Sequence, residues 1–197
     1  MKSKNYETTL PEGYKEAMHI NAKDLKVGII MNLIALIPIV IFMVAAVLLM
    51  LLPSYEADTE FDYGGIIIFG ILYIVYIVLH ELTHGAAYKI LTRQKLTFGL
   101  TLTVAFCGVP HIYTYRKAAL IAICAPFAIF NVVFGALTAV MYFSNTWLYI
   151  ISALLFSVHF GGCIGDLWLM LLLNTKFKDN DTLMRDTGPE QFIYVKE

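Results

Sequence analysis

Four long apolar runs with few charged residues constrain the fold more than any other feature of this sequence. They cover residues 27–52, 64–91, 118–143 and 147–173. Each is long enough to cross a hydrocarbon core as a helix, which takes roughly 20 apolar residues. Over the whole chain 15% of the residues are charged, against about 25% in a typical soluble domain. The sequence therefore predicts an all-α integral membrane protein with about four transmembrane helices.

Charge and cysteine content exclude several other classes of protein. The formal net charge is −1 and the sequence has no basic stripe, so we expect no nucleic-acid partner. The three cysteines are odd in number and widely spaced, which argues against a disulfide framework or a cysteine-type zinc site. The segment before the first run is too long and too acidic for a signal peptide, so we expect that run to be retained as an anchor.

The apolar runs divide the chain into three parts. Residues 1–26 form an N-terminal segment, residues 27–173 a membrane domain, and residues 174–197 a polar tail. Within these parts we expect a short surface helix over 15–26 and an acidic external loop over 53–63.

The basic residues predict the orientation of the chain. They lie in the N-terminal segment, around the connection between the second and third runs, and in the tail, whereas the two other loops have none. Cytoplasmic loops carry an excess of Lys and Arg. We therefore expect a multi-pass protein of the cell membrane, with both termini and that connection on the cytoplasmic side.

The connection between the second and third runs has the pattern of strands. Residues 97–106 alternate strictly between large apolar and small or polar side chains, which is typical of a β-strand. Residues 107–110 then predict a turn, and residues 111–115 can return as a second strand. We expect a cytoplasm-facing β-hairpin at 95–116, beside the second helix; a plain connector is the alternative.

Residues 80–84 read His-Glu-Leu-Thr-His and lie inside the second apolar run. Histidines four positions apart lie on one face of a helix, so both can bind a single metal ion. Glu81 is then placed to act on the proton of a metal-bound water. An ionisable group at the centre of a span costs about 2.5–3.5 kcal/mol, so such groups are rare unless they are compensated. A metal ion would supply that compensation.

Asp166 is the candidate for a third ligand. It lies 19 residues after Trp147, near the end of the fourth run. His80 and His84 lie 16 and 20 residues after Gly64 in the second run. Because both runs are expected to cross in the same direction at about 1.5 Å per residue, the three side chains reach a similar depth. Two histidines, one carboxylate and an open position are typical of a catalytic zinc site.

Two other polar residues in the spans could belong to the site. His159 lies seven residues before Asp166 on nearly the same helix face, and could be a substitute third ligand, a partner of a ligand, or a packed residue. Asn131 could bond a substrate backbone or another helix. A structural alternative also stays open, in which the histidines and Asp166 are satisfied by neighbouring helices alone.

Several short motifs carry a family resemblance. Residues 80–85, the turn at 107–110, Ala125–Phe127 and the Gly165–Asp166 pair resemble a family of small bacterial membrane proteins described as "putative zincin peptidase". That family is in turn similar to the site-2 intramembrane metalloproteases. The resemblance covers most of the chain.

The resemblance implies zinc bound by His80, His84 and Asp166, with Glu81 as the catalytic base. It implies a zinc-dependent intramembrane endopeptidase whose partners are the lipid bilayer and a membrane-embedded or membrane-adjacent protein or peptide substrate. Two other classes are compatible with the residues. One is a non-catalytic transporter or scaffold, and the other is a membrane haem protein using His80 or His84 with His159.

Overall fold

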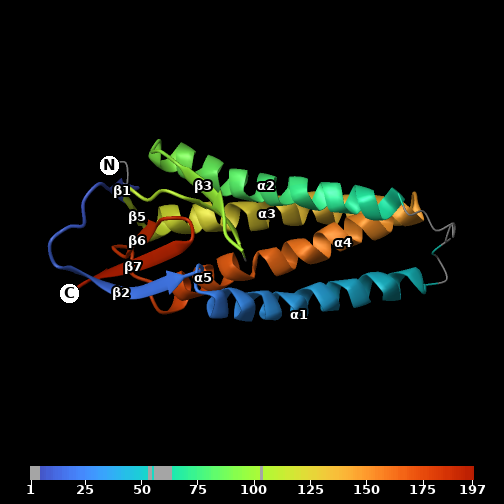
Figure 1. The fold of residues 1–197 in the computed structure, drawn as a ribbon, viewed down its shortest axis with the longest axis horizontal. Coiled ribbons are helices and arrows are strands. Elements are labelled where there is room, and N and C mark those ends of the chain that lie inside the picture. The colour runs from blue at the N-terminus through green and yellow to red at the C-terminus, as the bar shows by residue number, and fades with distance from the viewer. Residues whose placement is uncertain (1–4, 53–54, 56–63, 103) are drawn as a thin grey trace. The chain divides into compact units, whose positions relative to one another are not determined.

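The computed structural model describes residues 5–52, 55, 64–102 and 104–197 (Figure 1). The loop expected at 53–63 lies outside the described residues, apart from Tyr55. The described part of the chain contains five α-helices: α1 (Leu25–Met50), α2 (Gly64–Thr92), α3 (Arg116–Tyr142), α4 (Thr146–Gly162) and α5 (Ile164–Thr175).

Helices α1, α2 and α3 are each long and apolar enough to cross a membrane, which makes the chain a membrane protein. Helices α4 and α5 form a fourth candidate span, bent by 43° at the break between them. The sequence predicts one continuous helix over 147–173, and this is where the structure differs. Gly161 and Gly162 stand at the end of α4, and glycine is a poor helix former, which explains the position of the break.

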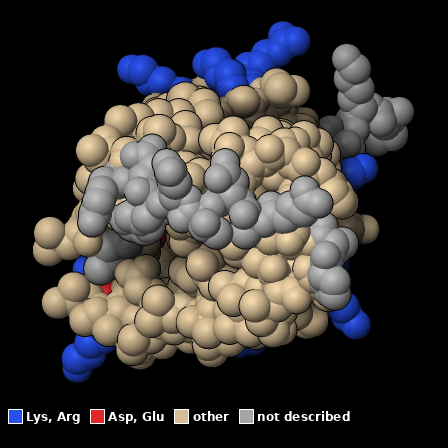
Figure 2. Space-filling model, turned by 90° about the vertical axis from the view of Figure 1, so that its right-hand side faces the viewer, with Lys and Arg blue, Asp and Glu red and all other residues tan. Residues whose placement is uncertain are grey.

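Large apolar side chains cover the outside of the helices. Within α1, all of which is described, Gly28 is the one buried residue, and Leu33 and Ile41 are more than half exposed. Figure 2 shows a surface that is mostly uncharged, with Lys and Arg side chains projecting at its margin. Soluble proteins rarely expose apolar surface on this scale, whereas lipid tails accept it.

The chain forms two compact units. The first, here called the sheet unit, comprises Met1–Met31, Leu79–Pro126 and Gly165–Glu197, and the second, the helical unit, comprises Asn32–Val78 and Phe127–Ile164. The core of the sheet unit includes buried residues of α2, α3, α5 and the strands, among them Tyr88, Ala122, Leu173, Met184 and Ile193. The core of the helical unit is largely aromatic, with Tyr76, Phe130 and Phe134 beside Ile151 and Leu155.

The prediction of an all-α fold is wrong, because the sheet unit contains a five-stranded antiparallel sheet with the order β1–β5–β6–β7–β2. The strands are β1 (Tyr6–Glu7), β2 (Tyr14–Asn21), β5 (Tyr113–Tyr115), β6 (Leu183–Asp186) and β7 (Glu190–Lys196). Three of them have four residues or fewer. Such short segments do not display the period-two pattern that identifies a strand in a sequence.

Strand β2 occupies most of the segment where the sequence predicts a short surface helix. It pairs with β7 from Tyr14, opposite Lys196, to Asn21, opposite Glu190, with a bulge between Glu16 and Met18. The two strands come from opposite ends of the chain. Strand formation here depends on a distant partner, which the local sequence does not reveal.

A separate two-stranded hairpin consists of β3 (Thr97–Leu100) and β4 (Ala105–Gly108). The predicted single strand over 97–106 is wrong, because the chain reverses after Leu100. Thr101 closes the turn: its N–H donates to the carbonyl oxygen of Val104 at 2.8 Å, and its hydroxyl oxygen accepts from the Val104 N–H at 3.0 Å. The alternation continues through the turn and so does not show the reversal. The segment expected to return, at 111–115, contributes β5 to the larger sheet instead.

The turn between β6 and β7 offers a test of this packing. Gly188 has a φ of +100°, and a Cβ atom there would overlap the Phe106 ring. Gly188→Ala should lower the free energy of unfolding by about 1–3 kcal/mol, because it adds both strain and overlap. Thermal unfolding in detergent measures the loss. Gly70→Ala is the matched control, since a Cβ at Gly70 meets nothing within 4 Å. Equal midpoints for the two variants would contradict the prediction.

Candidate metal centre

Helix α2 presents His80 and His84 on one face, as the four-residue spacing predicts. Both residues are buried, with 7% and 8% of their surface exposed, and their ring centroids are 4.9 Å apart. No Gly or Pro interrupts the helix between them, so the uninterrupted backbone fixes their separation. Both belong to the sheet unit.

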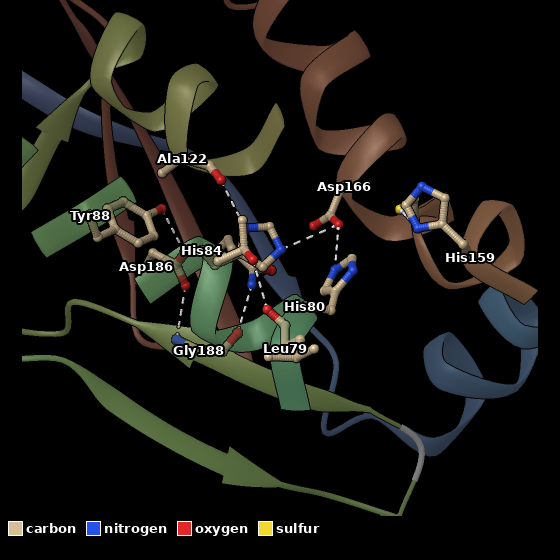
Figure 3. A network of polar contacts seen from close by, with 12 residues as sticks. Leu79, His80, His84, Tyr88, Ala122, His159, Asp166, Asp186 and Gly188 are labelled. Atoms are coloured by element: carbon tan, nitrogen blue, oxygen red, sulfur yellow. Dashed lines mark hydrogen bonds and ion pairs between the residues drawn. The ribbon is translucent and has the colours of Figure 1, made fainter. Parts of the chain in front are cut away.

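Asp166 completes a cluster of three donors in the same unit (Figure 3). Its Oδ2 lies 3.2 Å from Nε2 of His80 and 3.4 Å from Nε2 of His84. Asp166 stands in the first turn of α5, where the helix dipole favours a negative charge. The break at the start of α5 therefore brings a carboxylate to the beginning of a helix at the point where two imidazoles meet it.

The spacing of these three donors suits a zinc ion. Ligand atoms about 2.1 Å from a tetrahedral zinc lie about 3.4 Å from one another. The two distances from Asp166 to the histidines match this value closely. The chemistry also fits, because two imidazoles and a carboxylate are a common set of ligands for catalytic zinc.

His84 is oriented by a second contact. Its Nδ1 lies 2.8 Å from the carbonyl oxygen of Ala122 in α3, to which it donates a hydrogen bond. A neutral histidine that donates from Nδ1 presents an unprotonated Nε2, which is the form that binds metal. Nothing in the sequence identifies Ala122 as part of the site, because any residue supplies a backbone carbonyl.

Glu81 is half-buried and lies next to the hairpin. The backbone N–H of Cys107 in β4 lies close to its carboxylate. The hairpin approaches this closely because residue 85 of α2 is a glycine: a Cβ atom there would come within 2.7 Å of the Phe98 ring and 3.2 Å of the Cys107 sulfur. In the sequence, the glycine directly after His84 is the one feature that indicates a close approach of another segment to this face of α2.

A buried carboxylate outside the predicted site extends the network. Asp186, at the end of β6, is 6% exposed and accepts hydrogen bonds from the Tyr88 hydroxyl at 2.8 Å and the Gly188 N–H at 2.9 Å. Burial raises the pKa of Asp186 to about 6, although both hydrogen bonds act in the opposite direction. The sequence alone does not single out Asp186, because a lone aspartate in a polar tail carries no motif.

Cys107 contributes its backbone to this region and not a thiolate. Burial, together with the nearby carboxylates of Asp186 and Glu81, raises the pKa of its thiol to about 12. The thiol is therefore neutral at physiological pH, and a neutral thiol is a poor nucleophile.

The two additional candidates lie in the helical unit. His159 is fully buried, and its Nδ1 lies 2.9 Å from the Tyr76 hydroxyl oxygen. Asn131 donates from Nδ2 to the carbonyl oxygen of Phe127 at 2.7 Å, which is a bond within its own helix. The structure thus brings His80, His84 and Asp166 together, places Glu81 beside His80, and gives Asn131 a bond within α3.

Fold and site together define a class of protein: a membrane protein with two histidines and an aspartate arranged to bind a metal. A family model described as "Putative zincin peptidase" matches residues 73–180, more than half of the chain, and the chain belongs to that family. The match includes all four residues of the candidate centre. No curated protein and no solved structure matches the chain. The family description indicates a zinc peptidase.

Asp186 predicts a dependence of stability on pH. Its pKa is raised on folding from 3.8 to about 6, so its contribution to stability is greatest below pH 3.8 and falls as the pH rises through 6. Asp186→Asn does not titrate, so its stability relative to wild type should rise between pH 4 and pH 7, by at most about 3 kcal/mol. Unfolding midpoints at several pH values measure the difference. Asp179→Asn, at an exposed tail carboxylate, is the control, and identical pH profiles for wild type and Asp186→Asn would contradict the prediction.

Proposed function

We propose that this protein is a zinc-dependent intramembrane endopeptidase that hydrolyses a peptide bond of a membrane-embedded or membrane-adjacent substrate. One observation carries the proposal. A single oxygen of Asp166 lies 3.2 and 3.4 Å from the two Nε2 atoms of the His-Glu-x-x-His helix, which is the ligand spacing of tetrahedral zinc. The family description supports the peptidase class.

In this proposal His80, His84 and Asp166 hold the zinc and leave one position open. Bound zinc would lower the pKa of a water molecule and polarise the scissile carbonyl. Glu81 acts as the general base: its carboxylate takes a proton from the attacking water and passes it to the leaving amine. The Cys107 N–H orients that carboxylate, and the Ala122 carbonyl orients the His84 ring.

The surroundings of the site support a position within the membrane. Helix α2, which carries both histidines and the glutamate, is apolar enough to be a span. The distribution of Lys and Arg favours both termini and the hairpin on the cytoplasmic side of the cell membrane. The similarity to site-2 intramembrane metalloproteases, inferred from the motifs, is part of the same proposal.

The hairpin suggests how a substrate binds. Thr101 bonds to Val104, so in the alternating ladder Ala105 and Cys107 direct their N–H groups away from β3. The Cys107 N–H meets Glu81, which places this edge of β4 beside the general base. An extended substrate segment could pair with the edge by β-augmentation and present its backbone to the site.

The other classes receive less support. The haem alternative, which needs His159 as an axial ligand, is less favoured because the family description indicates a zinc peptidase. A transporter or scaffold would differ from the proposed enzyme in lacking stoichiometric zinc.

Metal content tests the ligand set. Purified wild type should hold about one zinc ion per chain, measured by mass spectrometry of the metal. His80→Ala and Asp166→Asn should each lose most of it, because two remaining ligands bind zinc poorly. His19→Ala, which changes an exposed histidine of β2, is the matched control. A zinc-free wild type, or full zinc in Asp166→Asn, would contradict the assignment.

Glu81→Gln separates the general base from the ligands. The variant should keep its zinc, because the residue is not a ligand, and should lose about 10²- to 10⁴-fold in cleavage rate. The assay uses single-span model peptides that carry a fluorophore and a quencher, reconstituted with the enzyme in lipid vesicles. Unchanged cleavage would rule out Glu81 as the base.

Proline substitutions test which edge of the hairpin binds substrate. Ala105→Pro removes an N–H directed away from β3, so no bond within the hairpin is lost, and cleavage should fall about tenfold or more with zinc unchanged. Leu100→Pro is the matched control, because its N–H lies on the outer edge of β3. If cleavage falls in Leu100→Pro and not in Ala105→Pro, the substrate pairs with β3. Unchanged cleavage in both variants would contradict β-augmentation.

A further inference from the structure

Asp186 connects three segments of the sheet unit (Figure 3). Its carboxylate accepts hydrogen bonds from the Tyr88 hydroxyl of α2 and from the Gly188 N–H in its own turn. Its backbone carbonyl oxygen accepts a hydrogen bond of 2.8 Å from the N–H of Val109, the residue that follows β4. One residue of the C-terminal segment thus joins the histidine-bearing helix to the end of the hairpin.

The β6–β7 turn also packs directly on β4. A Cβ atom at Gly108 would overlap the backbone of Thr187 and Gly188, and one at Gly188 would overlap the Phe106 ring. The two backbones can approach this closely because both contact residues are glycines. The turn therefore limits the movement of β4 over its last three residues.

Strand β4 in turn contacts the proposed general base. The Cys107 N–H, one residue before Gly108, lies close to the Glu81 carboxylate, and the Cys107 sulfur would be 3.2 Å from a Cβ atom at Gly85, one turn further along the same helix. Tyr88 lies seven residues after Glu81 in the same helix. Asp186 therefore bonds to both elements that meet at this point: the helix that carries the carboxylate and, through Val109, the end of the strand that carries the amide.

We propose that Asp186 is a positioning residue for Glu81, acting through Tyr88 and through strand β4. The role rests on the proposed function, because it concerns the geometry of the base in that reaction. A buried carboxylate is unfavourable for stability, and an apolar residue would fill the same space without that cost. Asp186 lies beyond residue 180, where the family match ends. In this proposal, the C-terminal segment therefore contributes to the site from outside the matched region.

The positioning role differs in its consequences from a purely structural one. Displacing a general base by about 1 Å slows the chemical step by up to about 100-fold but leaves the ligands in place. A structural role alone would affect zinc content, substrate binding and stability together. A fall in kcat without a change in KM or zinc content therefore distinguishes a positioning role from a structural one.

The test compares Asp186→Ala, Asp186→Asn and Tyr88→Phe in the full-length protein. Zinc content is measured on each, and kcat and KM are measured with the fluorogenic single-span peptides in vesicles. Asp186→Ala should lower kcat about 10- to 100-fold, with KM and zinc content unchanged. Asp186→Asn should recover most of the rate, because its amide oxygen still accepts from Gly188 and its NH₂ group donates to the Tyr88 oxygen.

Tyr88→Phe removes one hydroxyl and keeps the ring in the core, so it provides a second, milder variant if Asp186→Ala does not fold. It should lower kcat by a smaller factor in the same direction. Asp179→Ala, at an exposed carboxylate of the same tail, is the matched control and should behave as wild type.

Hydrogen exchange supplies a readout that does not depend on activity. The amides of residues 105–109 should exchange about tenfold faster or more in Asp186→Ala than in wild type, because the strand loses its support from the turn. Exchange in the helical unit should not change. The measurement needs neither substrate nor zinc.

The outcomes separate this inference from the proposed function. A wild type that holds no zinc and cleaves no peptide would overturn the proposed function and the role that depends on it. A wild type that holds zinc and cleaves, with the kcat of Asp186→Ala equal to that of wild type, would overturn the positioning role alone. If zinc content and kcat fall and KM rises together in all three variants, the role of Asp186 is structural, and the positioning role is likewise overturned.

Discussion

The candidate centre depends on one carboxylate oxygen between two imidazoles. In an apolar environment, each of these groups would be costly alone, and their mutual contact offsets part of that cost. The contact requires that α2 and α5 meet at a fixed distance, which in turn depends on the break between α4 and α5. The bend after Gly162 puts Asp166 into the first turn of a new helix, where the dipole stabilises its charge.

The apolar helices and the strands contribute differently to the site. The helices supply the three donor side chains and the proposed base, at spacings set by helical geometry. The strands and the neighbouring helix supply backbone groups: the Ala122 carbonyl to His84 and the Cys107 N–H to Glu81. Backbone groups held in regular structure move little, so they are effective at fixing the orientation of a reactive side chain.

The sequence predicted the membrane helices well and the strands poorly. Apolar runs of more than 20 residues are unambiguous, because few other structures tolerate them. The five-stranded sheet was missed because its strands are short and come from both ends of the chain, so the all-α prediction failed. The hairpin was found but its turn was misplaced, since the alternation of residues 97–106 continues through the reversal at Thr101.

The sequence by itself determined the membrane class, the family and the spacing of His80, Glu81 and His84, because these follow from composition and from the local geometry of one helix. Tertiary structure decided what the local pattern could not. It placed Asp166 against both histidines, and it brought Asp186, Tyr88 and β4 to the proposed base. These contacts join residues far apart in the chain, and only the packing of helices and strands fixes the distances between them.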